Sequence, residues 1–418
     1  MKIISYLFPW IGLLNKDIVK NDIFAGISAA ILILPQAIAF AIIAGLPPAY
    51  GLYTAIFPVL VASLFGSSWL MISGPNIALV VMIPLAVIPL ASIDAAEYIS
   101  HVITLTFMVG MMQLLFTFLG FTKFFIHFSH TVLLAITSSV GVTIILKQFD
   151  DILGLSSEIL SFEGINTYAL IIGLSTLVSG FVIRSSFKKW PYLIMATFIG
   201  MIVFYSIEII FDTSDLALLQ VGHITLSDWS VSQPVFFSYD FLMVLWKLLP
   251  WAFLIAMMGL IQSLLISKAT AQESHHSLNL NREAYGQGLS NVLGSFLSCM
   301  PSGGSFNRSA ANIDVGGKTP LVVMVSVVFL TFIIFIAEPF LATIPLAIIA
   351  GLLILVGLSM IKYVEIRRLF IDDKKGALLF VVSLFLTLIA GLSYGLVFGL
   401  SLSIWSYIKS LLKESKVN

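Results

Sequence analysis

The sequence has little charge and almost no cysteine. Only 10% of its 418 residues are charged, whereas soluble domains average about 25%. Its 21 basic residues balance its 21 acidic ones, so the net charge indicates no nucleic-acid partner. The single cysteine, Cys299, cannot form an internal disulfide. Since the sequence shows neither a cluster of metal ligands nor a nucleophile paired with a base, we expect no metal, no cofactor and no catalytic residue.

The sequence is instead rich in apolar runs, which recur from Ile23 to Leu412. Hydrophobic residues make up 59% of the chain, and a membrane-spanning helix needs about 20 of them in a row. We therefore predict an all-α polytopic protein embedded in the lipid bilayer of a bacterial inner membrane. The fourteen predicted segments are 22–44, 50–64, 76–90, 96–119, 124–146, 168–183, 191–210, 241–271, 282–297, 305–315, 320–337, 344–361, 376–390 and 392–412.

The long polar loop at 211–239 divides these segments into seven plus seven. An odd number in each half gives the halves opposite orientations, which is the inverted-repeat architecture of many transporters. We predict an interfacial segment at 1–20, repeats at 21–212 and 240–412, and a tail at 413–418. The loops at 147–166 and 211–239 are acidic, whereas the loops on the other side hold most of the lysines and arginines. The positive-inside rule then places both termini in the cytoplasm.

Two stretches, 66–80 and 297–318, interrupt the apolar pattern in corresponding halves of the chain. Each has a short extended run, a Ser-Gly break and then a short helix, which begins at Asn76 in the first and at Ser305 in the second. Irregular backbone at membrane depth must be buried in protein or line a cavity. Paired interrupted segments of this kind indicate a transporter's binding site, so we expect the two short helices to meet near the bilayer midplane.

The chemistry of these stretches favours an anion. Each helix N-terminus carries roughly half a positive charge, and Arg308 adds a full one. No acidic residue lies in 34–43, 73–83, 261–267 or 299–312, so a cation finds no carboxylate there. Pro35 is expected to disturb the helix of the first span and free carbonyl groups next to Gln36. The predicted substrate-binding residues are Gln36, Phe40, Ser73, Gly74, Asn76, Ile77, Gln262, Gly304, Ser305, Phe306, Asn307 and Arg308.

Structural interpretations of the same residues stay open. An alternative role for Arg308 is to cap the last carbonyl groups of a neighbouring helix, and Gln262 is a candidate for an interhelical hydrogen bond. Ser73 and Ser305 also suit close helix packing. An intramembrane hydrolase with Ser305 as its nucleophile is a further class, although the sequence offers no paired base.

Three separated motifs resemble the sulfate permease family, also called solute carrier family 26. They are PQAIAFAIIAGLPPAYGLY at 35–53, GSSWLMISGPNIA at 66–78 and LSNVLGSFLSCMPSGGSFNRSAANIDVGGKTP at 289–320. The resemblance implies fourteen segments in two inverted repeats, a core and a gate domain, a homodimer, and an elevator-like motion. It also implies a small inorganic anion as substrate, with sulfate first and bicarbonate or chloride next.

The sequence departs from this family pattern at a few positions. Family members usually carry a cytoplasmic STAS domain after the last span, and this sequence stops before one, as either a naturally short or a truncated member would. Gln262 stands where many bacterial members have an acid, and Ile266 is apolar, so coupling to Na⁺ or H⁺ is not expected at this position. Asn307 stands where Ser or Thr is common. An uncoupled anion channel and a nucleobase-type symporter of the same fold are the alternative functions, although the symporter's acids are missing here.

Overall fold

The computed structural model describes residues 9–90, 94–125, 128–153, 166–187, 192–211, 241–274, 276–392, 394–395, 397–399, 401–402 and 405. Several predictions lie outside these residues. They concern the start of the interfacial segment (1–8), most of both acidic loops (154–165 and 212–240), much of the last span, and the tail at 413–418.

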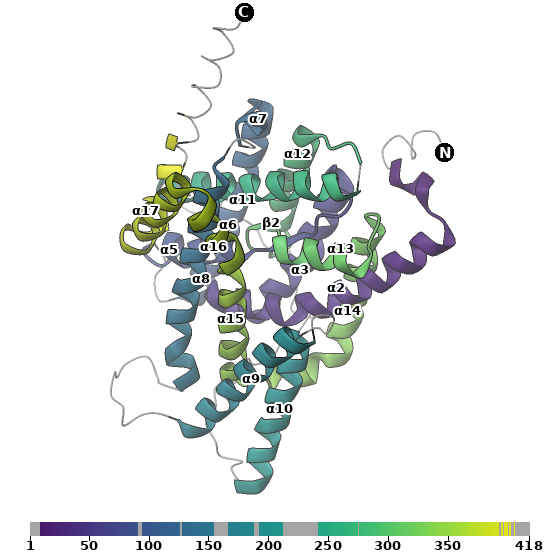
Figure 1. Cartoon of the computed structure of the whole chain (residues 1–418), viewed down its shortest axis with the longest axis vertical. Coiled ribbons are helices and arrows are strands. Elements are labelled where there is room, and N and C mark those ends of the chain that lie inside the picture. The colour runs from purple at the N-terminus through teal and green to yellow at the C-terminus, as the bar shows by residue number, and fades with distance from the viewer. Residues whose placement is uncertain are drawn as a thin grey trace, which may run out of the picture. The chain divides into compact units, whose positions relative to one another are not determined.

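The described chain is almost entirely helical (Figure 1). Before residue 212 the elements are η1 (Pro9–Leu13), α2 (Lys16–Ile43), α3 (Pro48–Phe65), β1 (Ser73–Pro75), α4 (Ile77–Val80), α5 (Met82–Val87), α6 (Ala95–Phe118), α7 (Thr122–Phe125), α8 (His130–Leu153), α9 (Thr167–Ser186) and α10 (Tyr192–Phe211). After residue 240 they are α11 (Phe241–Ser274), α12 (Leu280–Ser295), β2 (Ser302–Gly304), α13 (Phe306–Val315), α14 (Leu321–Ala342), α15 (Leu346–Met360), α16 (Tyr363–Asp372) and α17 (Lys374–Ala390).

The predicted fold class is confirmed. Within the described residues, eight helices are long and apolar enough to cross a membrane, and Ile77–Val87 and Leu321–Ile336 are shorter apolar helices. Each half of the chain contains one short strand followed by a short helix, as the inverted-repeat pattern requires.

Helix α2 continues through Pro35 to Ile43, so the disturbance expected at this proline does not divide the helix. One missing N–H does not end a helix whose residues on both sides of the proline are packed among neighbours. The predicted half-helix at 76–90 is in turn divided into α4 and α5. Pro84 lies in the first turn of α5, where its missing N–H has no intrahelical partner to lose.

Two further expectations about segment boundaries are wrong. The span expected at 124 begins at His130, since the short helix α7 ends at Phe125. The stretch 362–375, interpreted as a basic loop, contains the ten-residue helix α16. Its apolar and charged residues alternate with helical spacing, a pattern that a search for long apolar runs does not detect.

The chain forms two compact units, and each draws on both halves of the sequence. The first unit contains α2 to α7, α11 to α13 and most of α14; its core includes Ala25, Val59, Ile72 and Val322. The second unit contains α8 to α10 and α15 to α17, and its core joins α8 to α15 and α17. Both strands lie in the first unit. The compact units are therefore a different division of the chain from the predicted sequence repeats.

Candidate functional site

The two interrupted stretches meet as a small antiparallel ribbon. Strand β1 pairs with β2 in the register Ser73–Gly304, Gly74–Gly303 and Pro75–Ser302. All six residues are buried. The Ser305 N–H extends the pairing by donating to the Ile72 carbonyl at 3.1 Å. The expectation that these segments come together is therefore confirmed, and each strand leads directly into its short helix.

Side chains of α13 satisfy the backbone on the other side of the first stretch. Asn312 Nδ2 donates to the Leu70 carbonyl at 2.9 Å, and Ser309 Oγ accepts the Ile72 N–H at 3.0 Å. Backbone at membrane depth has no water to bind, so these polar side chains replace it. The buried face of α13 thereby holds the irregular segment 70–75 in place.

Arg308 lies on this same face and is only 4% exposed. Its Nη1 donates to the Ser73 carbonyl at 3.0 Å and its Nη2 to the Pro75 carbonyl at 2.8 Å. Its Nε is buried and has no hydrogen-bond partner among the described residues. No acid in the described chain forms a salt bridge with this side chain. The charge is therefore held by neutral carbonyl groups and stays uncompensated.

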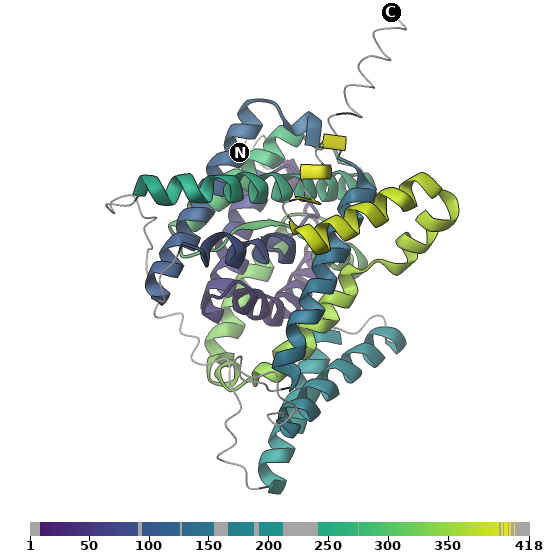
Figure 2. The same cartoon turned by 90° about the vertical axis from the view of Figure 1, so that its left-hand side faces the viewer.

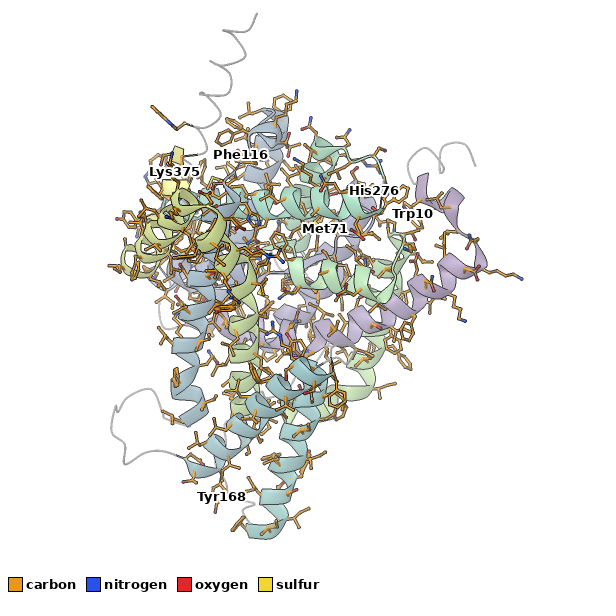
Figure 3. All side chains as sticks on the ribbon, in the orientation of Figure 1. Trp10, Met71, Phe116, Tyr168, His276 and Lys375 are labelled. Atoms are coloured by element: carbon orange, nitrogen blue, oxygen red, sulfur yellow. The ribbon has the colours of Figure 1, made fainter. Side chains whose placement is uncertain are left out.

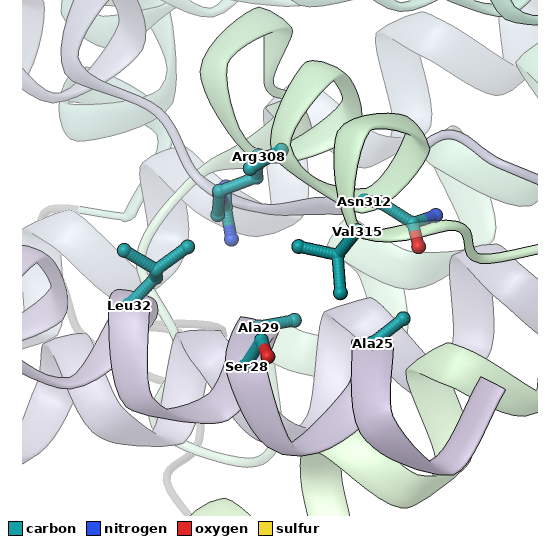
Figure 4. Close-up of a pocket in the computed structure, with 8 residues that line it drawn as sticks. Ala25, Ser28, Ala29, Leu32, Arg308, Asn312 and Val315 are labelled. Atoms are coloured by element: carbon teal, nitrogen blue, oxygen red, sulfur yellow. The ribbon is translucent and has the colours of Figure 1, made fainter. Parts of the chain in front are cut away.

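A small cavity of about 10 Å³ adjoins Arg308, between α13 and α2 (Figure 4). Its volume is about that of one water molecule, far less than the volume of a hydrated anion site. It is lined by Ala25, Ser28, Ala29, Leu32, Arg308, Ala311, Asn312 and Val315. The cavity is thus a packing gap beside the arginine and not an anion chamber.

Gly74 is the position where only glycine fits the ribbon. Its φ of +133° lies in the region that L side chains rarely adopt, and a Cβ there would lie 2.6 Å from Arg308 Nη1. The absence of a side chain at this position lets the guanidinium approach the strand. Opposite, Met71, labelled in Figure 3, packs beside Gly304, since a Cβ at Gly304 would lie 2.7 Å from its sulfur.

Asn76 ties the first short helix to both neighbouring elements. Its Oδ1 accepts the Ala78 N–H at 3.0 Å and so caps α4. Its Nδ2 donates to Gln262 Oε1 at 2.9 Å and to the Gly304 carbonyl at 2.6 Å. The interhelical role that was left open for Gln262 is therefore the contact observed. Because α4 has only four residues, its dipole is weaker than a full half-charge.

Seven of the predicted site residues fall into two groups. Ser73, Asn76, Gln262 and Arg308 are buried and engaged in the bonds described above. Ser305 and Phe306 are half-buried and Asn307 is exposed, all at the start of α13. The Ser305 side chain does not cap this helix. The start of α13 is thus where the site reaches its surroundings.

The predicted residues of α2 and α4 have different positions. Phe40 and Ile77 are buried, and Gln36 is half-buried. Helix α2 contacts α4, the short helix that follows β1. No hydrogen bond links Gln36 to the ribbon in the described part of the chain. The structure therefore leaves Gln36 available and does not connect it to the other site residues.

A polar stripe on α12 supports the ribbon and was missed by the sequence analysis. Asn291 Nδ2 donates to the Ser302 carbonyl at 3.0 Å, and Asn291 Oδ1 accepts the Ser302 N–H at 2.8 Å. Gln287 Nε2 donates to Ser73 Oγ at 2.8 Å, while Glu283 accepts the N–H groups of residues 67 and 68 at 2.7 Å each. The four-residue spacing of these three polar residues, which places them on one face of a helix, was the available signal.

Comparison with known proteins finds a family model and several transporters that are similar to this chain. The model of the sulfate permease family matches residues 19–383. Sulfate transporter 4.1, chloroplastic, of Arabidopsis thaliana is 28% identical over 96% of this chain and 60% of its own length. The bicarbonate transporter BicA of a Picosynechococcus strain is 27% identical over 90% of this chain and 67% of its own. The chain spans about three-fifths of the length of the plant relatives that it matches.

Solved structures support the same fold. The transmembrane domain of a cyanobacterial bicarbonate transporter, BicA, has a TM-score of 0.80 at 26% identity and covers 91% of this chain and 98% of that domain. SLC26A9 has a TM-score of 0.84 at 19% identity and covers 98% of this chain and 69% of its own. At such low identity the second match shows the fold alone.

Proposed function

Because the family model matches most of this chain, the chain belongs to the sulfate permease family, and we propose that it is a secondary transporter of inorganic anions. The relatives named above are transporters and not enzymes. This supports a transport function and leaves the intramembrane hydrolase without support.

The observation that carries the proposal is the uncompensated charge of Arg308. This guanidinium is buried on the first turn of α13, and its bonded partners in the described chain are carbonyl groups. A buried positive charge without a counter-ion lowers the free energy of an anion that comes near it. The N-terminus of α13, with N–H groups that have no partner within the helix, adds to the same field.

The contacts suggest two different roles for the predicted site residues, one structural and one in contact with the anion. Ser73, Asn76, Gln262 and Arg308 build the site, because they are buried and bind the ribbon and its neighbours. Ser305, Phe306 and Asn307 are less buried. The anion contacts the start of α13, at Ser305, Phe306 and Asn307, and is reached from α2 by Gln36 and Phe40. Arg308 then acts on the anion through its electric field and not through a direct bond.

Substrate, motion and assembly belong to the same proposal. Sulfate is our first choice and bicarbonate the second, because relatives named for each match this chain at similar identity. The first compact unit is assigned the core role and the second the gate role, in an elevator-like mechanism within a homodimer. We place the protein in the inner membrane with both termini in the cytoplasm. Gln262 is neutral, so transport does not depend on Na⁺ through this position.

Flux in proteoliposomes tests the proposal. Purified protein is reconstituted, and uptake of radiolabelled sulfate is measured with bicarbonate or chloride inside the vesicles, with and without an Na⁺ gradient. Saturable uptake that the internal anion accelerates, and that Na⁺ does not change, is the expected result. If sulfate is not taken up but bicarbonate or chloride is exchanged, the substrate order is wrong and anion transport stands. Conductance without exchange supports a channel, and no anion flux overturns the proposal.

A further inference from the structure

Helix α16 is a short, unburied helix between two apolar ones in the second compact unit. The chain leaves helical geometry at Ile361 and Lys362, with ψ values of 92° and 71°, so α16 is separate from α15. After Asp373 the chain enters α17, and α16 packs along it (Figure 2). No residue of α16 is buried. Any apolar side chains on the outward side of this helix therefore require an apolar partner outside the unit.

The inner face of α16 is fixed by its packing. Ile366 and Leu369 pack against a small core formed by Leu134, Ala135 and Phe380. Residues three or four apart share one face of a helix. The opposite face must therefore point away from the rest of the unit.

That opposite face is apolar and exposed. Tyr363, Val364 and Ile371, which we call the outer stripe, are 70%, 62% and 67% exposed. Arg367 lies within the stripe, four residues after Tyr363 and four before Ile371. An apolar stripe that includes a basic residue, on a helix directly after an apolar spanning helix, is typical of helices that lie in the headgroup layer of a bilayer.

The charges around the stripe are unbalanced. The segment 362–375 contains five basic and three acidic residues, an excess of two positive charges. Two of the acids have bonds of their own: Glu365 binds Lys362 at 3.0 Å, and Asp373 accepts the N–H groups of Lys375 and Gly376 at the start of α17.

Arg368 lines a cavity together with Glu365, Asp372 and Asp373. Besides Lys362 and Arg368, the segment has three more basic residues, which do not line this cavity and form a separate group. Salt bridges within the described residues involve none of Arg367, Lys374 and Lys375, which we call the basic trio, and all three are exposed. Lys375 is labelled in Figure 3. A free phosphate would bind the basic trio but would leave the outer stripe exposed to water. An anionic phospholipid binds the basic trio with its headgroup and covers the outer stripe with its acyl chains.

We propose that α16 lies in the headgroup layer at the bilayer face where α15 ends, with the outer stripe at the acyl boundary and the basic trio bound to phosphates of anionic phospholipids. The helix thereby recruits anionic lipid to the second compact unit. This inference rests on the charge and exposure of α16 and is independent of the anion that the protein transports.

Collisional quenching by brominated lipid tests both parts of the proposal. The whole chain carries Val364→Cys labelled with bimane, in vesicles of phosphatidylcholine mixed with phosphatidylglycerol. In one preparation only the phosphatidylcholine is brominated, and in a second only the phosphatidylglycerol, at equal fractions. The chain without a new cysteine reports any labelling of Cys299, which is buried. Asp372→Cys is the matched control, since Asp372 lines a cavity with His130 and Glu365 on another side of α16.

The proposal predicts strong quenching at position 364 and little at 372. Brominated phosphatidylglycerol quenches more strongly than brominated phosphatidylcholine, because basic residues near the membrane surface attract anionic lipid. Combining Arg367→Gln, Lys374→Gln and Lys375→Gln makes the two lipids equal, whereas Arg367→Lys alone keeps the difference. Quenching at 364 no greater than at 372 overturns membrane insertion, and equal quenching by both lipids in the unsubstituted trio overturns headgroup binding. Neither readout requires anion transport.

Discussion

The guanidinium of Arg308 is held by backbone carbonyl groups instead of carboxylates. Removing a charged group from water costs several kcal/mol, and an acidic partner would offset much of that cost. An acid at this place would also cancel the positive field. The two carbonyl groups of β1 position the side chain and leave its charge intact, which is what an anion site requires.

Gly74→Ala is expected to damage both stability and anion binding. The new Cβ would combine a strained φ of +133° with a contact of 2.6 Å to Arg308 Nη1. Strain of this kind costs roughly 1–3 kcal/mol, and displacement of the guanidinium disturbs the field at α13. Thermal unfolding in detergent and equilibrium binding of sulfate measure the two effects.

Gly120→Ala is the control for backbone strain alone. Gly120 also has a positive φ, +78°, but a Cβ there meets no atom within 4 Å. This variant should lose some stability and keep the sulfate affinity of the unsubstituted protein. If Gly74→Ala also keeps that affinity, the proposed link between the glycine and Arg308 is wrong.

Gln262→Glu is expected to weaken anion binding without disturbing the fold. The carboxylate replaces the amide in almost the same volume and still accepts the bond from Asn76 Nδ2. It adds a negative charge to an acid-free site; at ~10 Å and an effective dielectric constant of about 20, such a charge opposes an anion by roughly 1.7 kcal/mol, more than tenfold in affinity. Gln262→Met removes the hydrogen bond without adding charge. Equal losses of sulfate affinity in the two variants would show that charge is not the cause.

Among the elements, α12 supplies the support that the ribbon needs. Asn291→Ala removes the side chain that both donates to and accepts from Ser302. Each buried polar group left without a partner costs about 1–3 kcal/mol, so a clear fall in the thermal midpoint is expected. Ser290→Ala is the matched control, since Ser290 Oγ donates only within its own helix, to the Gln287 carbonyl. Similar midpoints for both variants would refute the supporting role of Asn291.

The connection between α11 and α12 is expected to respond to acid. His276, labelled in Figure 3, stacks on Trp69 with ring centroids 4.7 Å apart. Burial lowers the pKa of His276 below its ordinary value of 6.5, so the neutral ring is the stacked form at neutral pH. The unfolded chain then binds a proton more readily than the folded one. The stabilisation is complete above pH 6.5 and is lost as the pH falls through the lowered pKa.

Tryptophan fluorescence checks this pH dependence. The difference between the unsubstituted protein and His276→Gln should change only below pH 6.5, when the protonated ring quenches Trp69. A transition above pH 6.5 would contradict the assignment.

The elements differ in how well the sequence predicts them. The meeting of β1 with β2 was predictable, because two small, polar, glycine-rich stretches interrupt an otherwise apolar chain. The stripe of Glu283, Gln287 and Asn291 was not found, since α12 holds further polar residues, such as Arg282 and Ser290, and its composition does not single out one face. That α2 continues through Pro35 could not be predicted either, because a local rule about proline cannot include the packing of a long membrane helix.

For the whole molecule, each half contributes one side of the site. The first half provides β1 with its carbonyl groups, and the second provides β2 and α13 with Arg308. The ribbon therefore depends on contacts between residues more than 200 positions apart, such as Ile72 with Ser309 and Asn76 with Gly304. The residue types at these positions were visible in the sequence. Their pairing, and the inward orientation of Arg308, required the structure.

Equilibrium binding of sulfate to two Arg308 variants tests the central claim most directly. Arg308→Gln keeps N–H donors for the carbonyl groups of β1 but removes the charge, whereas Arg308→Lys keeps the charge and changes the hydrogen bonds. Size-exclusion chromatography first establishes that both variants are folded. The account then predicts that sulfate affinity falls more than tenfold in Arg308→Gln and much less in Arg308→Lys. Unchanged affinity in Arg308→Gln would show that this buried charge does not bind the anion, and would contradict the account.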